Sequence, residues 1–357
     1  DIRLVYWAGG NPFHHHQDLN RLREAFSRPD TVVVHEPFWT ATARHADLVL
    51  PVTTTLERDD IGGSRTDPRL VAMKQVLPPV GQARSDYAIF SDVAGRLGVG
   101  ERFTEGRSER AWLEAMYEQW AEHAVGAGVD VPPFAEFWER GELQLPPGPT
   151  GHVQFAAFRA DPAGAKLRTP SGRIEIFSQQ IDSFGYDDCP GHPTWLEPEE
   201  WLGSPLAARY PLALIANNPA TRLHSQHDVG ATSQASKVAG REPVRMHPAD
   251  MAARGIADGD VVRLFNGRGS CLAGAVASDA VRPGVVQLST GAWFDPDDPN
   301  AAIAMCRHGN PNVLTRDTGT SRLGQGCSGQ HALVEVERWE GPLPAVRSLE
   351  PPPIVGR

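Results

Sequence analysis

The sequence has 357 residues, a formal net charge of −10 and an isoelectric point near 5.7, and 40% of its residues are hydrophobic. This length allows a substantial core and suits a globular protein of two or three domains. The acidic balance excludes a broad basic surface for nucleic acid or anionic membrane, so an anionic ligand would need a local site.

The chain carries no sign of membrane insertion or secretion. No stretch is apolar for the roughly 18 to 20 residues that a membrane span needs, and there is no signal peptide. We therefore expect no membrane partner and a cytoplasmic location, with the periplasm as the alternative if a signal precedes this sequence. Asp1 is followed directly by a strand-like segment without an initiator Met, which predicts the C-terminal portion of a larger protein.

The cysteines predict no metal centre. They lie far apart and form no pair with metal-ligand spacing, and they are Cys189, Cys271, Cys306 and Cys327. We expect reduced core residues, although the spacing leaves a disulfide open.

The chain opens with a predicted strand, tight turn and helix. The apolar residues before Tyr6 indicate a strand end, Gly9-Gly10-Asn11-Pro12 cannot continue it, and 17–26 has helical spacing. Such a turn brings backbone N–H groups to a sheet edge where nucleotides are commonly held. The triplet His14-His15-His16 follows. Because consecutive side chains point in different directions, we favour hydrogen-bonding histidines over a metal site.

Short β-branched or apolar runs at 31–34 and 46–51 continue this rhythm and predict a parallel α/β sheet. Asn11, Glu36 and the polar run after Pro51 then share one edge of that sheet. Glu36 is placed to accept hydrogen bonds from a ribose or a purine, while a solvated loop carboxylate is the competing interpretation. The run 53–60 is also compatible with a capped helix start.

Further elements complete a first domain over 1–180. We expect a strand at 70–76, helices at 86–97 and 110–123, and an excursion without core elements at about 126–150, rich in Gly and Pro. The run 169–177 predicts a turn that leads into a strand. A linker over 181–209 follows.

From Tyr210 the texture changes to short strands separated by turns. The expected strands are 212–216, 244–246, 261–265, 272–276, 285–288 and 332–336. Many short strands in succession predict a β-barrel, which we place at 210–345 with a tail over 346–357.

Two polar loops stand out in this second half, at 217–227 and 307–326. Their many donors and acceptors suit a polar ring such as a pterin, because buried polar groups need partners. A hydrolase is disfavoured, since the neighbouring Ser and His lack a nucleophile elbow.

Five motifs in register resemble the dimethyl sulfoxide reductase family of molybdenum enzymes, with biotin sulfoxide and trimethylamine N-oxide reductases as the most similar branches. The motifs are Gly9-Gly10-Asn11-Pro12-Phe13 with His15-His16-Gln17-Asp18, the run 39–51, Glu57-Arg58-Asp59-Asp60-Ile61, Arg222-Leu223-His224-Ser225-Gln226 and Asp317-Thr318-Gly319-Thr320-Ser321. The resemblance covers nearly the whole chain. It implies a Rossmann-like α/β domain followed by a C-terminal β-barrel of the double-psi type.

The resemblance also implies a cofactor and its contacts. Family members bind molybdenum through two molybdopterin guanine dinucleotides and reduce S-oxides or N-oxides by oxygen-atom transfer. The implied cofactor-binding residues are Asn11, His15, Gln17, Glu36 and Asp59 at one dinucleotide, and His224, Ser225, Gln226, Asn312 and Gln325 around the pterins. No residue of this chain matches the serine that ligates molybdenum, which the family carries in its N-terminal half.

The resemblance therefore implies that these 357 residues hold the cofactor but cannot turn over alone. The implied partners are the missing N-terminal half, a small S-oxide or N-oxide substrate, and NADPH or a small redox protein as electron donor. The competing hypothesis is a non-catalytic nucleotide- or pterin-binding protein on the same scaffold.

Overall fold

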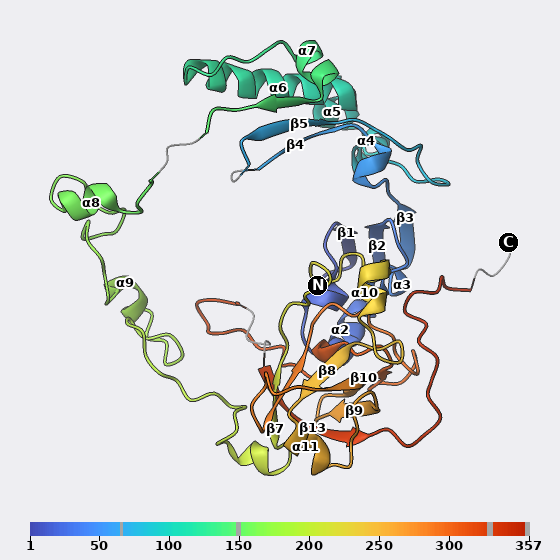
Figure 1. Ribbon diagram of the computed structural model, residues 1–357. Helices are drawn as coiled ribbons and strands as arrows, with labels where there is room; N and C mark the ends of the chain where they lie inside the picture. Colours follow the sequence, from blue (N-terminus) through green and yellow to red (C-terminus); the bar gives the residue numbers. More distant parts are fainter. Residues whose placement is uncertain (65–66, 148–150, 327–330, 354–357) are drawn as a thin grey trace. The chain divides into compact units, whose positions relative to one another are not determined.

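A computed structural model describes residues 1–64, 67–147, 151–326 and 331–353. The chain divides into two compact units, and Figure 1 labels the elements of both. The first unit comprises 1–34, 39–48 and 175–357, and the second comprises 35–38 and 49–174. This division does not test the domain boundaries expected from the sequence, which therefore stay predictions.

The chain opens with the expected strand, turn and helix. The elements in order are β1 (Leu4–Ala8), α1 (Pro12–His15), α2 (Leu19–Phe26), β2 (Thr31–Glu36), α3 (Ala41–Arg44) and β3 (Leu48–Pro51). Gly9 and Gly10 form the turn at φ +103° and +77°, in the region that favours glycine. The parallel sheet has the order β1-β2-β3. Because it holds only three strands among the described residues, the Rossmann-like classification is not confirmed.

The second half of the chain forms the expected barrel. Its strands are β7 (Leu212–Ile215), β8 (Pro243–Met246), β9 (Val261–Phe265), β10 (Ser270–Ala277), β11 (Val285–Leu288) and β13 (His331–Arg338), with β12 (Met305–Cys306) beside β10. The strand order is β10-β8-β11-β7-β13-β9, and β10 also pairs with β9 in antiparallel register. This last pairing closes the sheet, so the predicted C-terminal barrel is confirmed. Its double-psi connection stays a prediction.

The opening turn shares the core of the barrel. Phe13, Leu19 and Ala41 are buried in the same hydrophobic cluster as Leu214 and Val286 of the barrel strands. Burying such side chains contributes roughly 1.5 to 3 kcal/mol for each large one. The turn is therefore anchored directly against the barrel.

Short helices connect the remaining parts of the first unit. They are α9 (Gln179–Asp182), η2 (Pro205–Ala208), α10 (Ala231–Ala235), α11 (Pro248–Ala252) and η3 (Pro311–Val313). The strand expected within 169–177 is wrong, because that run is irregular and Ile174 and Ile176 are 73% and 78% exposed. Alternating apolar residues need a partner strand to form a ladder, and the described residues supply none there.

The second unit contains an antiparallel sheet and several helices, some of which share a hydrophobic cluster with the sheet. The sheet has the order β4 (Asp60–Gly63), β5 (Arg69–Met73) and β6 (Glu142–Gln144), and the helices are η1 (Thr55–Glu57), α4 (Asp86–Arg96), α5 (Gly100–Thr104), α6 (Glu109–Gly126), α7 (Phe134–Arg140) and α8 (Ala156–Ala160). The expectation of no core element at 126–150 is wrong. Phe134, Phe137 and Leu143 are buried with Tyr117, since these apolar side chains outweigh the Gly- and Pro-rich local signal.

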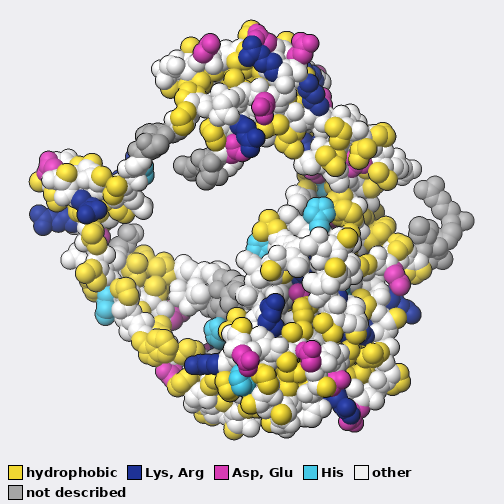
Figure 2. Space-filling model, viewed as in Figure 1, with side chains coloured by type: hydrophobic (Ala, Val, Ile, Leu, Met, Phe, Trp, Pro, Cys, Tyr) yellow, Lys and Arg dark blue, Asp and Glu magenta, His cyan; other side chains and the backbone are white. Residues whose placement is uncertain are grey.

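Charges of both signs are scattered over the face shown in Figure 2. In the part of the chain that the structure describes, no helix has the length and apolar character to cross a membrane. Cys189, Cys271 and Cys306 are free thiols, and Cys327 lies outside the described residues. Burial raises the pKa of both the Cys271 and the Cys306 thiol, as expected for unreactive core residues.

Candidate functional site

Polar segments far apart in the sequence meet beside the barrel, and we call residues 9–18, 217–228, 289–293 and 308–315 the loop cluster. The Asn312 side-chain amide donates to the His14 carbonyl at 3.1 Å. The Asn310 amide donates to the carbonyls of Phe13 at 3.2 Å and Ala292 at 2.9 Å. These buried bonds join the opening turn to the last polar loop, as expected for segments that build one site.

His15 and His224 come together at the surface of the loop cluster. Their ring centroids are 5.6 Å apart and the rings are nearly perpendicular. Both side chains are exposed. Burial, followed by the neighbouring His224 and His16, lowers the pKa of His15 and favours its neutral form. A neutral His15 imidazole can donate and accept a hydrogen bond toward an uncharged heterocycle.

Several predicted residues line up beside this pair. The Gln17 amide donates to the His15 carbonyl at 3.1 Å, and the buried Ser225 offers its carbonyl to the Trp293 indole N–H at 3.0 Å. Gln226 is exposed on the same segment. The structure thus brings His15, Gln17, His224, Ser225, Gln226 and Asn312 into the loop cluster.

Asn11 also belongs to the loop cluster, whereas Gln325, Glu36 and Asp59 lie outside it. The Asn11 amide oxygen accepts from the Thr42 hydroxyl on α3. Gln325 is exposed, and its amide donates to the Ser321 carbonyl at 2.9 Å. Glu36 and Asp59 belong to the second unit, where Asp59 accepts from the Gln75 backbone N–H at 2.9 Å.

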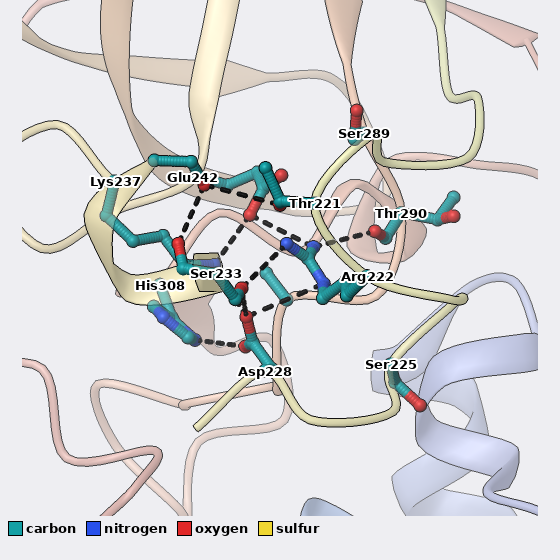
Figure 3. A network of polar contacts seen from close by, with 12 residues as sticks. Thr221, Arg222, Ser225, Asp228, Ser233, Lys237, Glu242, Ser289, Thr290 and His308 are labelled. Carbon is teal, nitrogen blue, oxygen red and sulfur yellow. Dashed lines mark hydrogen bonds and ion pairs between the residues drawn. The ribbon is translucent and has the colours of Figure 1, made fainter. Parts of the chain in front are cut away.

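A buried charge network includes residues of the loop cluster, and sequence reasoning missed it (Figure 3). Its charged side chains are Arg222, Asp228, Lys237 and Glu242, and none is more than 3% exposed. The Lys237 ammonium lies 2.8 Å from an Asp228 oxygen and 2.6 Å from a Glu242 oxygen. Two cations therefore balance two carboxylates, as burial of charge requires. Arg222 belongs to the motif Arg222-Leu223-His224-Ser225-Gln226, but nothing in the sequence indicates which charged residues pair.

One further group, His308, completes the electrostatics of this network. Burial by itself would raise the pKa of Asp228, but His308, Lys237 and Arg222 outweigh it and hold this pKa well below its usual range. Burial and the Lys237 charge lower the pKa of His308 to about 4. Asp228 is thus ionised and His308 neutral at neutral pH.

His14 is the histidine of the triplet that lies inside the protein. Its side chain is buried, and neither ring nitrogen has a hydrogen-bond partner among the described residues. Burial lowers its pKa to about 3. The exposed side chains of the loop cluster include the imidazoles of His15 and His224 and the amide of Gln226. Such groups fit a polar, uncharged ring system of the pterin type.

The buried histidines predict acid sensitivity. An unfolded histidine has a pKa of about 6.5, so between pH 6.5 and about 4 the unfolded chain binds protons that folded His14 and His308 do not. Their contribution to stability is complete above pH 6.5 and falls with pH by roughly 1.4 kcal/mol per unit for each histidine. We expect urea unfolding at pH 7 and pH 5 to show this loss.

The variant His308→Gln should flatten that pH dependence, because it removes one of the depressed titrations. The control His123→Gln changes an exposed histidine on α6 and should leave the dependence as it is. If the free energy of unfolding of His308→Gln fell with pH as steeply as that of the unchanged protein, His308 would not contribute to the acid sensitivity.

Two regions of the chain match known protein families. Residues 1–96 match the family "Molybdopterin oxidoreductase", and residues 212–333 match the family "Molydopterin dinucleotide binding domain". The loop cluster draws its segments from both matched regions.

Curated relatives match along nearly the whole chain. The identity is 48% with a dimethyl sulfoxide/trimethylamine N-oxide reductase of Cereibacter sphaeroides, over 99% of this chain and 43% of the relative. It is also 48% with a biotin sulfoxide reductase of the same organism, over 96% and 45%. A trimethylamine-N-oxide reductase of Haemophilus influenzae is 46% identical over 99% and 43%. This chain therefore spans less than half the length of these relatives.

A solved structure shares the fold. The acetylene hydratase of Pelobacter acetylenicus superposes with a TM-score of 0.71 at 19% identity, over 94% of this chain and 44% of that chain. At this identity the similarity concerns the fold alone.

Proposed function

The chain belongs to the molybdopterin oxidoreductase family that includes the dimethyl sulfoxide, trimethylamine N-oxide and biotin sulfoxide reductases, and on this premise we propose that it is the C-terminal, cofactor-binding part of a molybdenum-dependent S-oxide or N-oxide reductase. Reduction of an S-oxide consumes two electrons and two protons and releases the sulfide and water. The molybdenum cofactor supplies the oxygen-atom transfer when bound, while this chain binds and orients it.

The observation that carries the proposal is the meeting of His15 and His224. They come from the two separately matched regions, and their rings lie 5.6 Å apart at an exposed edge of the loop cluster. A ligand at this edge would contact both regions at once. The proposed cofactor-binding residues are Asn11, His15, Gln17, Glu36, Asp59, His224, Ser225, Gln226, Asn312 and Gln325.

The finer description of the cofactor follows the family resemblance. We propose that the cofactor contains two molybdopterin guanine dinucleotides. One of the dinucleotides would lie beside the sheet β1-β2-β3 of a Rossmann-like domain, and the pterins would lie against a double-psi barrel. The corresponding domains are 1–180, a linker at 181–209 and the barrel at 210–345.

The partners follow the same proposal. They are a small S-oxide or N-oxide, the N-terminal half of the protein with its molybdenum-ligating serine, and NADPH or a small redox protein as electron donor. We propose a cytoplasmic location, with the periplasm as the alternative.

The proposal is tested by producing this chain, and the longer protein that would contain it, in cells supplied with molybdate. Metal analysis, pterin fluorescence and reduction of dimethyl sulfoxide, trimethylamine N-oxide and biotin sulfoxide are measured on both. We expect molybdenum, pterin and reductase activity in the longer protein and no turnover by the 357 residues alone. A pterin without molybdenum in the longer protein would favour the non-catalytic hypothesis.

Two variants test the site itself. In the longer protein, His15→Ala and His224→Ala should each weaken cofactor binding by roughly 5- to 150-fold, since each removes a hydrogen bond worth roughly 1 to 3 kcal/mol when its partner is left buried. The molybdenum and pterin content after purification reports this loss. His16→Ala is the matched control, because His16 is an exposed neighbour in the same triplet. Equal losses in all three variants would contradict the assigned contacts.

A further inference from the structure

We propose that Arg222 is a positioning residue that holds the segment 223–228 in its binding conformation from inside the protein. The inference rests on the proposed function only for the identity of the ligand that His224 and Gln226 would contact. The physical claim about the segment rests on its backbone conformation and its anchors.

The segment adopts an unfavourable backbone conformation twice. His224 and His227 have φ values of +51° and +55°, in the left-handed region that side chains other than glycine rarely adopt. Such a conformation persists only when the surrounding structure holds it in place. The contacts that hold this segment therefore determine its backbone conformation.

The anchors reach the segment from beneath. The Arg222 Nε–H donates to the His224 carbonyl at 3.2 Å, and the Trp293 indole N–H donates to the Ser225 carbonyl at 3.0 Å. The backbone of Gly291 passes directly against the His224 carbonyl, leaving no room there for a side chain. The backbone is thus tied inward, while the side chains of His224 and Gln226 are exposed.

The Arg222 guanidinium is itself fixed in position. Besides His224, it donates to the Ser233 hydroxyl at 3.1 Å, to a Glu242 oxygen at 3.0 Å and to the Thr290 carbonyl at 2.9 Å (Figure 3). Its side chain is 1% exposed. Arg222 therefore has no access to a ligand of its own, and it acts through the segment that it holds.

Lysine cannot replace this arrangement. Arg222→Lys keeps the charge that balances the network, but a single ammonium lacks the planar fork that serves four acceptors at once. We expect the His224 carbonyl to lose its donor while the charge balance beneath it remains.

The experiment measures amide hydrogen exchange by mass spectrometry on the full chain. In Arg222→Lys we expect the peptide covering 223–228 to exchange roughly tenfold faster, as loss of one charge-assisted bond allows. Peptides of β9 should exchange as in the unchanged protein. Arg254→Lys is the control, because Arg254 forms an ion pair with Glu335 at 2.8 Å on the barrel. Among the described residues, Arg254 makes no hydrogen bond or ion pair with the segment 223–228. Unchanged exchange of 223–228 in Arg222→Lys would overturn the proposal.

A second variant covers the case in which Arg222→Lys does not fold. Trp293→Phe removes only the indole N–H that binds the Ser225 carbonyl and keeps most of the buried ring. The same peptide should again exchange faster. Unchanged exchange here would likewise count against anchoring from beneath.

Cofactor content separates this inference from the proposed function. If the longer protein binds molybdenum and pterin, both variants should retain several-fold less of each, and full retention with a loosened segment would overturn the positioning role. If the unaltered longer protein binds no cofactor, the proposed function fails, while the exchange data still decide whether Arg222 holds the segment.

Discussion

We expect Asp228→Asn to lower the free energy of unfolding by roughly 3 to 5 kcal/mol, the usual cost of breaking a buried ion pair. The substitution leaves Lys237 and Arg222 buried against a single carboxylate, that of Glu242. It also weakens the contact in which an Asp228 oxygen accepts from the Trp293 backbone N–H at 3.1 Å. Urea unfolding at pH 7 measures the loss.

The control for this variant is Asp279→Asn, since Asp279 is 91% exposed and lies 3.8 Å from the His247 ring. We expect it to change stability by less than about 1 kcal/mol. The double variant Asp228→Asn with Lys237→Met removes one charge of each sign, so it should recover part of the loss. Strictly additive losses would show that charge balance is not what stabilises the network.

We expect Gly291→Ala to destabilise the protein by roughly 2 to 5 kcal/mol, through two separable costs. Gly291 has φ +93°, which L side chains rarely adopt. A Cβ atom there would also overlap the His224 carbonyl oxygen, so either the turn or the segment 223–228 must move. Thermal and urea unfolding report the total cost.

Gly259→Ala isolates the backbone part of that cost, so the difference between the two variants gives the steric part. Gly259 has a similar φ of +87°, but no atom lies within 4 Å of a Cβ built on it. It should therefore lose only the roughly 1 to 2 kcal/mol of the left-handed backbone. Equal losses in the two variants would mean that the close approach of Gly291 to His224 contributes nothing.

Local pattern was sufficient for much of the fold. The strands at 261–265 and 285–288 were predicted with the bounds that the structure has, because short apolar runs between turn residues favour one conformation. Predictions failed where packing outweighed local signals. Phe134 and Phe137 form a helix in a Gly- and Pro-rich stretch because their side chains pack in a hydrophobic core. Ile174 and Ile176 form no strand because no strand among the described residues pairs with them.

Residue identity and spacing along the chain were sufficient to predict the family, the barrel and the histidine and amide motifs of the candidate site. The folded structure was needed to show that His14 is buried while His15 lies beside His224. It was also needed to show that Arg222, Asp228, Lys237 and Glu242 neutralise one another. These features could not be predicted from the sequence because they depend on distances between segments that lie far apart in the chain. The pairing of the buried charges and the close approach of Gly291 to His224 are both of this kind.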